Sequence, residues 1–242
     1  MLTLYLPTYR RPHFFHRLLA SIEPQLCPEV TVVAAVNPPA DGYAFPEWLE
    51  VVHRRANTGG NVNCALGPIE AQTAYVWMLG DDEQLAPGAI AHVLNHLDGN
   101  LGCLIGWDGR FPVPHLGQRF ARLADYLGPH PHMASAMSLM SSTIWATDNY
   151  SARIAMRYMD TGYGWYFGLL DRALNDAAMV VSQPIFIPGH HRDASIWSEP
   201  LEVREQHMAQ YPGVWQILAD FIRDRSGVSL PVEQLGGAGF DS

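Results

Sequence analysis

The most informative absence in this sequence is lysine, because all 15 basic residues of the 242-residue chain are arginines. A chain without lysine has no P-loop lysine, no Schiff-base lysine and no lysine general base. If the protein binds phosphate, the charge must be met by arginine, by backbone amides or by a metal ion. Codon bias is the simplest origin of the absence, but these exclusions hold whatever its origin.

Cysteine and long apolar runs are also scarce. Cys27, Cys64 and Cys103 lie far apart and form no CxxC pair, which argues against a disulfide scaffold or a structural zinc site. No apolar run approaches the roughly 20 residues that span a bilayer. The short apolar run at residues 2–6 precedes its arginines, whereas a signal peptide has them first. We therefore expect a cytoplasmic protein that begins where its gene begins, either free or peripheral at the membrane.

Charged residues are few, at 16% of the chain, and they are mostly acidic, giving a net charge of −9. The apolar share of 48% is ordinary for a folded protein, so long disordered tracts are excluded. The length suits one large domain or a domain with a lid. The acidic balance argues against nucleic acid as a partner.

Strand-like and helix-like segments alternate through about residue 105. The predicted strands are the apolar runs at 2–6, 30–36, 51–53, 74–79 and 101–105, and the predicted helices between them cover 13–22, 62–72 and 87–97. This alternation predicts an α/β fold with a mostly parallel central sheet flanked by helices.

The pattern changes after residue 105, because residues 106–147 carry four prolines and show weak periodicity. Beyond them, the sequence predicts helices at 148–157 and 163–176, a strand at 180–187, and one or two helices over 201–225. The last helix carries an apolar stripe, made of Trp215, Leu218, Phe221 and Ile222. Such a stripe indicates a core or homodimer face more often than a membrane anchor.

Polar clusters follow the predicted strands of the first half, at residues 7–11, at Asn37, at 57–61 and at 81–83. Ligands of open α/β sheets bind at the carboxyl ends of the strands. The three adjacent carboxylates at 81–83 are suited to Mg²⁺ or Mn²⁺ holding a diphosphate. They are equally suited to capping the helix that follows, and spacing alone leaves both interpretations open.

Three of these segments, taken in order, resemble the family-2-type GT-A glycosyltransferases, in particular the O-antigen and natural-product sugar transferases. Residues 4–11 resemble the opening of that family, residues 57–71 its second motif and residues 75–85 its metal-binding DxD segment. The resemblance extends over residues 2–100. It implies the GT-A fold, with a helical acceptor-side region toward the C-terminus.

The resemblance also implies an activity. Such an enzyme moves a hexosyl or deoxyhexosyl group from a nucleotide-diphosphate sugar, foremost a UDP-sugar, to an acceptor hydroxyl, with a divalent cation and with inversion. The acceptor would be a glycan, a lipid-linked molecule or a small molecule. Residues 1–105 would form the Rossmann-like half that binds the donor, residues 106–235 the acceptor-side half of the same domain, and residues 236–242 a flexible tail.

A nucleotide pocket follows residue by residue from the resemblance. Its predicted members come from the loops after the strands: Pro7, Thr8, Tyr9, Arg11, Asn37, Asn57, Gly59, Asn61 and Asp81. The first loop would cradle the base, and Asp81 would approach the ribose or the metal. Asn37 stands where the family usually has a base-contacting aspartate.

The implied metal ligands are carboxylates and imidazoles. Asp82 would be the main ligand and Glu83 would bind through water, while His190 or His191 would complete the shell and favour Mn²⁺ over Mg²⁺. Arg192 would neutralise phosphate charge. The sequence departs from the family at Gly80, which replaces the first carboxylate of the usual DxD.

A second departure concerns the catalytic base. The family's acidic pair should lie seven residues before an arginine, but residues 165–166, before Arg172, are Trp and Tyr. We therefore predict Asp160 as the general base, with Asp108 in reserve. The alternative is that Asp160 only caps the helix that follows.

Two other functions compete with this prediction. A nucleotidyltransferase would need a glycine-rich loop after the first strand, and residues 8–11 contain no glycine. A catalytically degenerate GT-A-like protein that binds a nucleotide, a glycan or a protein partner is the stronger alternative, because Gly80 and the missing acidic pair both favour it. The aromatic residues within 145–167 offer an acceptor platform, although at least half of them are expected in the core.

Overall fold

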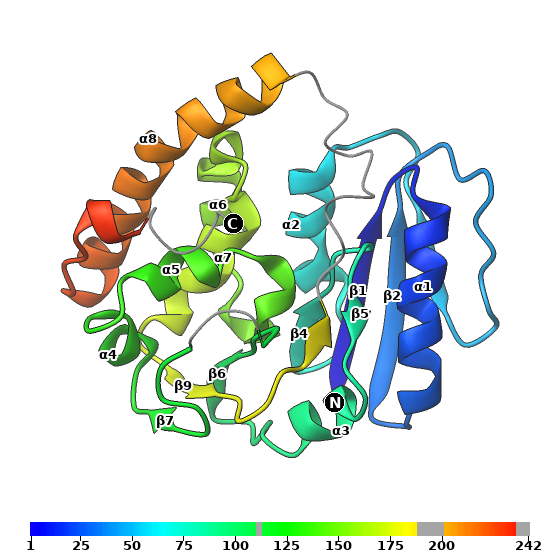
Figure 1. The fold of residues 1–242 in the computed structure, drawn as a ribbon, viewed down its shortest axis with the longest axis horizontal. Helices are drawn as coiled ribbons and strands as arrows, with labels where there is room; N and C mark the ends of the chain where they lie inside the picture. Colours follow the sequence, from blue (N-terminus) through cyan, green and yellow to red (C-terminus); the bar gives the residue numbers. More distant parts are fainter. Residues whose placement is uncertain (110–112, 188–200, 236–242) are drawn as a thin grey trace.

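A computed structural model describes residues 1–109, 113–187 and 201–235 (Figure 1). Its main feature is an eight-stranded sheet of order β3-β2-β1-β4-β8-β6-β9-β7. The strands are β1 (Leu2–Thr8), β2 (Val30–Val36), β3 (Glu50–His53), β4 (Tyr75–Met78), β6 (Leu101–Ile105), β7 (Arg119–Phe120), β8 (Thr143–Ala146) and β9 (Ala177–Val180). A separate antiparallel pair joins β5 (Gln84–Leu85) to β10 (Phe186–Ile187).

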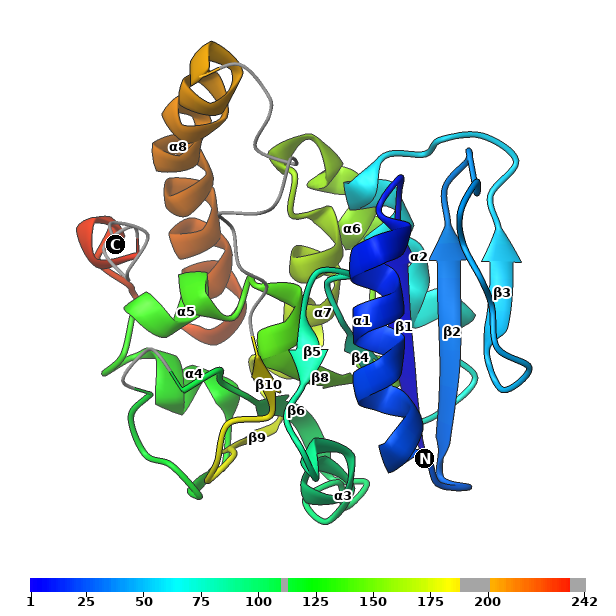
Figure 2. The same ribbon diagram turned by 45° about the vertical axis from the view of Figure 1, so that its right-hand side comes forward.

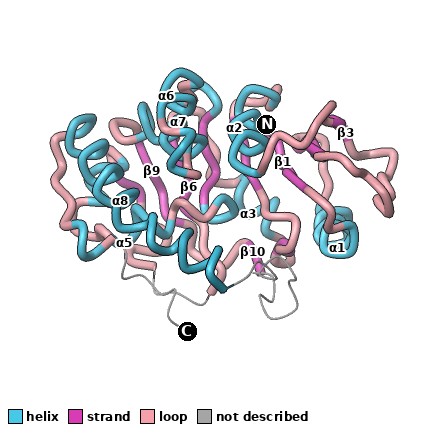
Figure 3. The backbone as a smooth tube through the Cα atoms, turned by 90° about the horizontal axis from the view of Figure 1, so that it is seen from above, coloured by secondary structure: helices cyan, strands magenta, loops and turns pink. Residues whose placement is uncertain are grey.

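Helices cover both faces of the sheet. They are α1 (Pro12–Ile22), α2 (Gly60–Glu70), α3 (Ala89–Leu94), α4 (Leu123–Leu127), α5 (His132–Ala136), α6 (Ala152–Arg157), α7 (Gly164–Ala173) and α8 (Leu201–Ser226). In Figure 3, α1 and α3 lie on one side of the strands, and α2, α6 and α7 lie on the other. Side chains of a strand point alternately to opposite faces. Accordingly, Leu4 and Leu6 of β1 pack in the core with α1, whereas Tyr5 packs in the core with α2 and α7.

The predicted parallel sheet is confirmed, and four of its seven strand pairings are parallel. Figure 2 shows β3, β2 and β1 side by side, with α1 in front of β1. β8, which lies between β4 and β6 and is antiparallel to both, was not predicted from the sequence. Four residues at the end of a proline-containing segment give too short a pattern to reveal a strand.

The strand predicted at 180–187 is wrong in its extent. β9 ends at Val180, and the chain then leaves the main sheet before β10 pairs with β5. Pro184 lies in the connection, and a proline has no N–H to donate to a strand ladder. The N–H of Ile185 is instead bonded to the carbonyl of Trp107, 3.0 Å away. The predicted tail at 236–242 lies outside the described residues.

The apolar stripe of α8 belongs to the core. Trp215, Leu218, Phe221 and Ile222 are all buried against the cluster that includes α7. The stripe is therefore a core face of this chain and supplies neither a dimer face nor a membrane anchor. None of the described helices is long and apolar enough to cross a membrane.

Gly67 sets how closely α2 approaches the sheet. A Cβ atom at this position would lie 2.8 Å from the Tyr5 ring. Gly67→Ala should therefore lower the free energy of unfolding by about 1–3 kcal/mol, since overpacking outweighs the better helix propensity of alanine. Gly60→Ala is the matched control, because a Cβ there meets nothing within 4 Å. Chemical denaturation should show a lower midpoint for the first variant alone, and equal midpoints would contradict the packing argument.

Candidate nucleotide and metal site

Parallel pairing brings the ends of β1, β2 and β4 to one edge of the sheet. β1 pairs in parallel with both β2 and β4, so the polar residues that follow the three strands meet there. The backbone N–H of Asn37, after β2, donates to the carbonyl of Thr8, the last residue of β1, over 3.0 Å. The Thr8 side chain in turn reaches Asp81, after β4.

A chain of hydrogen bonds fixes the Asp81 carboxylate. The backbone N–H of Arg11 donates to the Tyr43 hydroxyl over 2.9 Å, and the hydroxyls of Tyr43 and Thr8 are 2.8 Å apart. Thr8 donates its only hydroxyl proton to Asp81 Oδ2 over 2.6 Å. Tyr43 must therefore donate to Thr8. The loop between β2 and β3 thus contributes to the acidic site.

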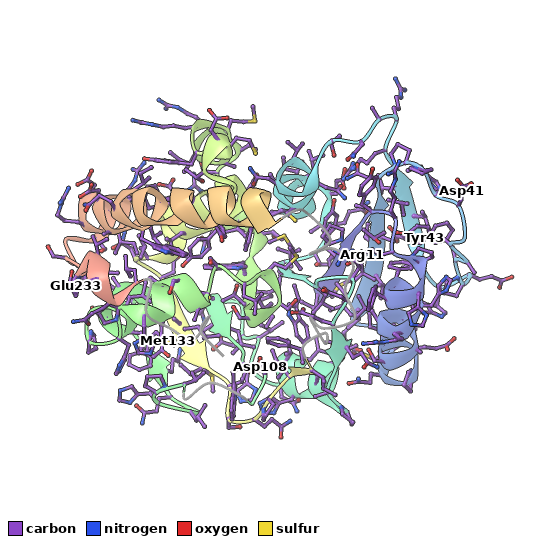
Figure 4. The ribbon with its side chains drawn as sticks, turned by 45° about the horizontal axis from the view of Figure 1, so that its top comes forward. Arg11, Asp41, Tyr43, Asp108, Met133 and Glu233 are labelled. Carbon is purple, nitrogen blue, oxygen red and sulfur yellow. The ribbon has the colours of Figure 1, made fainter. Side chains whose placement is uncertain are left out.

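The Arg11 side chain is paired with two carboxylates. Its Nη2 lies 2.6 Å from Asp81 Oδ1 and its Nη1 lies 3.4 Å from Asp82 Oδ2. The Asp81 side chain is fully buried, whereas about a fifth of the Asp82 side chain is exposed. Figure 4 shows Arg11 and Tyr43 near each other at the edge of the site, with Asp41 farther out on the same loop as Tyr43.

Burial dominates the electrostatics of Asp81. Loss of solvent raises the pKa of this carboxyl to about 6, and the negative charge of Asp82 adds to the rise, while Arg11 and the Thr8 hydroxyl oppose it. Its buried Oδ1 atom accepts no hydrogen bond of regular geometry and is ion-paired with the Arg11 guanidinium, 2.6 Å away. A buried carboxylate oxygen in that state is suited to a cation.

The residues present fit a divalent cation that is shared with a ligand. Asp81 and Asp82 offer hard oxygen atoms, the donors that Mg²⁺ and Mn²⁺ prefer. Among the residues that the structure describes, no group of three His, Cys, Asp or Glu side chains is arranged to hold a metal by itself. Mg²⁺ is usually bound by one or two carboxylates with substrate phosphates and water, which matches this donor set. Glu83 is buried beside them, and its binding through water stays a prediction.

Gly80 lies close to the carboxylates that follow it. A Cβ at Gly80 would lie 3.1 Å from Asp82 Oδ1 and 3.5 Å from the carboxyl carbon of Glu83. A side chain at this position would therefore require the Asp82 carboxylate to shift by a few tenths of an ångström. The Gly80 N–H donates to the Ser141 hydroxyl over 3.0 Å, which ties the acidic turn to the segment before β8.

The predicted pocket residues after β3 form a tight turn. Asn37 is buried, and its Oδ1 accepts from both the N–H and the hydroxyl of Thr58, each over 3.1 Å. The Asn57 side chain accepts from the N–H of Gly59 over 3.0 Å. Gly59 has a φ of +77°, a conformation that favours glycine. In the structure, the Asn37 side-chain oxygen therefore positions the turn that carries Thr58, and nucleotide contact by Asn37 stays a prediction.

A partly buried ion pair anchors α2 to the sheet. Arg54 and Glu70 are paired, and the Tyr5 hydroxyl accepts from Arg54 over 2.7 Å and donates to Glu70 over 2.8 Å. Asn63 donates its side-chain N–H to the carbonyl of Ala35 over 2.9 Å. These bonds join β1, β2 and α2, so the N-terminus of α2 has a fixed place at the edge of the sheet.

Asn61, at the start of α2, connects this helix to the segment that carries Asp160. Its side-chain N–H donates to the carbonyl of Met159, in the short 3-10 helix η4 (Met159–Thr161). Asp160 is exposed, and in the described part of the chain its side chain makes no hydrogen bond or ion pair. The N-cap of α7 is Tyr163, with no side-chain capping bond. The structure therefore gives Asp160 no capping role.

The remaining predicted residues have varied positions. Asp108 follows β6, which points the same way as β4 because both are antiparallel to β8; Figure 4 shows it well apart from Arg11. His190, His191 and Arg192 lie outside the described residues. The aromatic residues Trp145, Trp165, Tyr166 and Phe167 are buried in the core. This confirms a core role for four of the seven aromatics within 145–167.

Sequence comparisons do not assign this chain to a family, because no protein-family model and no curated protein matches it. Solved structures do match it. TarS of S. aureus, residues 1–349, aligns with a TM-score of 0.58 and 16% identity over 93% of this chain and 66% of that one. Glucosyl-3-phosphoglycerate synthase of Mycobacterium tuberculosis, with Mn²⁺, UDP and glucosyl-3-phosphoglycerate, aligns with a TM-score of 0.56 and 14% identity over 96% and 81% of the two chains.

The mannosyltransferase PcManGT of Pyrobaculum calidifontis, in complex with GDP-Man and Mn²⁺, aligns with a TM-score of 0.55 and 13% identity over 97% of this chain and 71% of that one. These neighbours are GT-A glycosyltransferases. The chain has the GT-A fold. It spans 66% of the TarS fragment and 40% of a longer TarS structure. The GT-A fold of this chain carries its acidic turn at the carboxyl end of β4.

Proposed function

We propose that this protein is a metal-dependent glycosyltransferase that moves a sugar from a nucleotide-diphosphate sugar, foremost a UDP-sugar, to an acceptor hydroxyl with inversion. One observation carries the proposal: the buried Asp81 and the partly exposed Asp82 adjoin the loop after β1 on a GT-A fold. Solved structures of that fold hold UDP-GlcNAc, UDP with Mn²⁺, UDP with Mg²⁺, and GDP-Man with Mn²⁺.

The proposed roles follow the placement of the side chains. Residues 1–105 hold the donor and residues 106–235 present the acceptor. Asp82 is the main ligand of the cation, because its side chain is reachable from solvent, and Asp81 supports it from the buried side. Tyr9, half-buried after β1, faces the base. A cation bound here offsets the negative charge that develops on the leaving diphosphate.

A catalytically degenerate protein that binds a nucleotide without transferring sugar is the second candidate. Its specific support is Gly80, which removes one DxD carboxylate, together with residues 165–166, which are buried aromatics where an acidic pair is expected. Both candidates bind a nucleotide diphosphate. They differ in whether the glycosidic bond of the donor breaks.

A thermal-shift panel tests nucleotide binding. Purified protein is heated with UDP, GDP, CDP or ADP, each with and without Mn²⁺. We expect UDP with Mn²⁺ to raise the melting temperature more than any other condition, since a ligand that binds only the folded state stabilises it by about 2.7 kcal/mol at 100 times its Kd. No shift with any nucleotide would contradict both candidate functions.

Donor hydrolysis then separates the enzyme from the binding protein. UDP-glucose and UDP-GlcNAc are incubated with protein and Mn²⁺, and free UDP is measured over time. Release of UDP that depends on both protein and metal supports the transferase. Tight nucleotide binding without release, across donors and with a panel of sugar acceptors, supports the degenerate protein.

A further inference from the structure

Among the predicted pocket residues that the structure describes, Arg11 is the one whose side chain is ion-paired with the carboxylates of the acidic turn, Asp81 and Asp82. Its guanidinium contacts Asp81 Oδ1 at 2.6 Å and approaches Asp82 Oδ2 at 3.4 Å. It therefore supplies positive charge between two carboxylates that would otherwise repel each other. A divalent cation bound to both carboxylates would need the space that the guanidinium occupies, and it would be repelled by the positive charge of the guanidinium.

The two contacts differ in strength. The pair with Asp81 is short and desolvated, whereas Nη1 makes no hydrogen bond and its distance to Asp82 is long for a charge-assisted contact. About a quarter of the Arg11 side chain is exposed. The backbone N–H of Arg11 is held by the Tyr43 hydroxyl, which fixes the start of the side chain.

The site offers few protein ligands for a metal ion. Among the described residues no three metal-binding side chains converge, so free metal would be held by two carboxylates that already have a cationic partner. Phosphate oxygens would add ligands for the metal and, at the same time, a new partner for the guanidinium. With no lysine in the chain, an arginine beside the site is the natural partner for that charge.

We propose that Arg11 is an internal counter-ion that competes with the divalent cation for Asp81 and Asp82, so that cation and nucleotide diphosphate bind together rather than cation first. This inference rests on the proposed function. When the site is empty, Arg11 neutralises the carboxylates. When a diphosphate is bound, Arg11 turns from Asp82 to the phosphate oxygens and leaves the carboxylates to the cation.

The test measures Mn²⁺ affinity without nucleotide, by electron paramagnetic resonance of free Mn²⁺ in weakly alkaline buffer. Arg11→Gln should bind Mn²⁺ about tenfold more tightly than the parent, because a gain of about 1.4 kcal/mol is modest for removing one like charge a few ångströms away. Arg11→Lys, which keeps the charge, should stay close to the parent. Arg10→Gln is the matched control: it removes the same charge, but Arg10 is exposed and lies over the Tyr9 ring at 5.1 Å.

A second titration repeats the measurement with saturating UDP. In the parent, UDP should tighten Mn²⁺ binding strongly, and by linkage Mn²⁺ should tighten UDP binding by the same factor. In Arg11→Gln that factor should shrink about tenfold, since no guanidinium has to be released. Melting curves of all variants without ligand confirm that each is folded at the assay temperature.

The outcomes separate the two proposals. Nucleotide-free Mn²⁺ affinity that is equal in parent, Arg11→Gln and Arg10→Gln, or undetectable in all three, overturns the counter-ion role of Arg11. Equal gains in Arg11→Gln and Arg10→Gln also overturn it, because the effect would then be one of net charge. Failure of the parent to bind UDP at saturating Mn²⁺ instead contradicts the proposed function, whatever the Mn²⁺ affinities without nucleotide.

Discussion

Asp82→Asn should abolish the Mn²⁺-dependent part of UDP binding while leaving the fold intact. An amide oxygen is a poorer ligand than a carboxylate, and Asp82 is the only one of the pair Asp81 and Asp82 that solvent reaches. We expect the affinity for UDP with Mn²⁺ to fall about 100-fold, the upper range for a group that supports a metal. Without Mn²⁺, the variant and the parent should bind UDP equally. Isothermal titration calorimetry of both proteins measures the difference.

Stability should change little in Asp82→Asn, because the pair that it loses with Arg11 is long and partly exposed. Asp41→Asn is the matched control, since Asp41 is exposed and lies farther out on the loop that carries Tyr43 (Figure 4). The control should retain the full Mn²⁺ effect. Equal affinities of Asp82→Asn and the parent for UDP in the presence of Mn²⁺ would contradict the assignment of Asp82 as a metal ligand.

Local sequence patterns were enough to predict the N-terminal half of the fold. The apolar runs that form β1, β2 and β4 are continuous because both faces of these strands are buried, and continuous runs are the sign of a parallel sheet covered on both sides. Parallel strands place their carboxyl ends together, so the meeting of Thr8, Asn37 and Asp81 at one edge could be predicted from their positions after the runs.

The sequence did not show which distant segments of the chain pair with or contact each other. β8 is four residues long and gains its place by pairing with β4 and β6, whose paired residues lie 38 or more positions earlier in the chain. Tyr43 lies in a loop without regular structure, and only the fold shows that its hydroxyl contacts Thr8 and Arg11. The sequence placed Arg11 near the base, but nothing in the spacing of residues indicates that it is paired with Asp81.

Some of the predicted pocket residues have roles in holding the site together. Thr8 and Asn37 were predicted as nucleotide contacts from the resemblance, and both use their side-chain oxygens inside the protein, toward Asp81 and Thr58. A motif marks where a site lies, but it does not show which of its residues hold the loops in place and which contact the ligand. Nucleotide contact by these two residues stays a prediction.

Asp160→Asn should lower kcat by about 10²–10⁴-fold, the contribution typical of a positioned general base. Asp160 is exposed beside Met159, whose carbonyl is bonded to Asn61 at the N-terminus of α2. The carboxylate is therefore carried by a segment that is bonded to the N-terminus of α2 and is open to solvent. Donor binding should be almost unchanged, since a base contacts the acceptor hydroxyl rather than the diphosphate.

A fall in activity must be separated from a loss of folded protein. The structure shows no capping bond from Asp160, because Tyr163 is the N-cap of α7 and has none from its side chain. The melting temperature of Asp160→Asn should therefore match that of the parent, without the loss of about 1 kcal/mol that removing a cap would cause. Asp108→Asn, made in parallel, tests the reserve carboxylate after β6. If Asp160→Asn is well folded and keeps kcat within a few-fold of the parent while Asp108→Asn loses it, the base lies on the β6 loop, and the acceptor must approach from that side of the acidic turn.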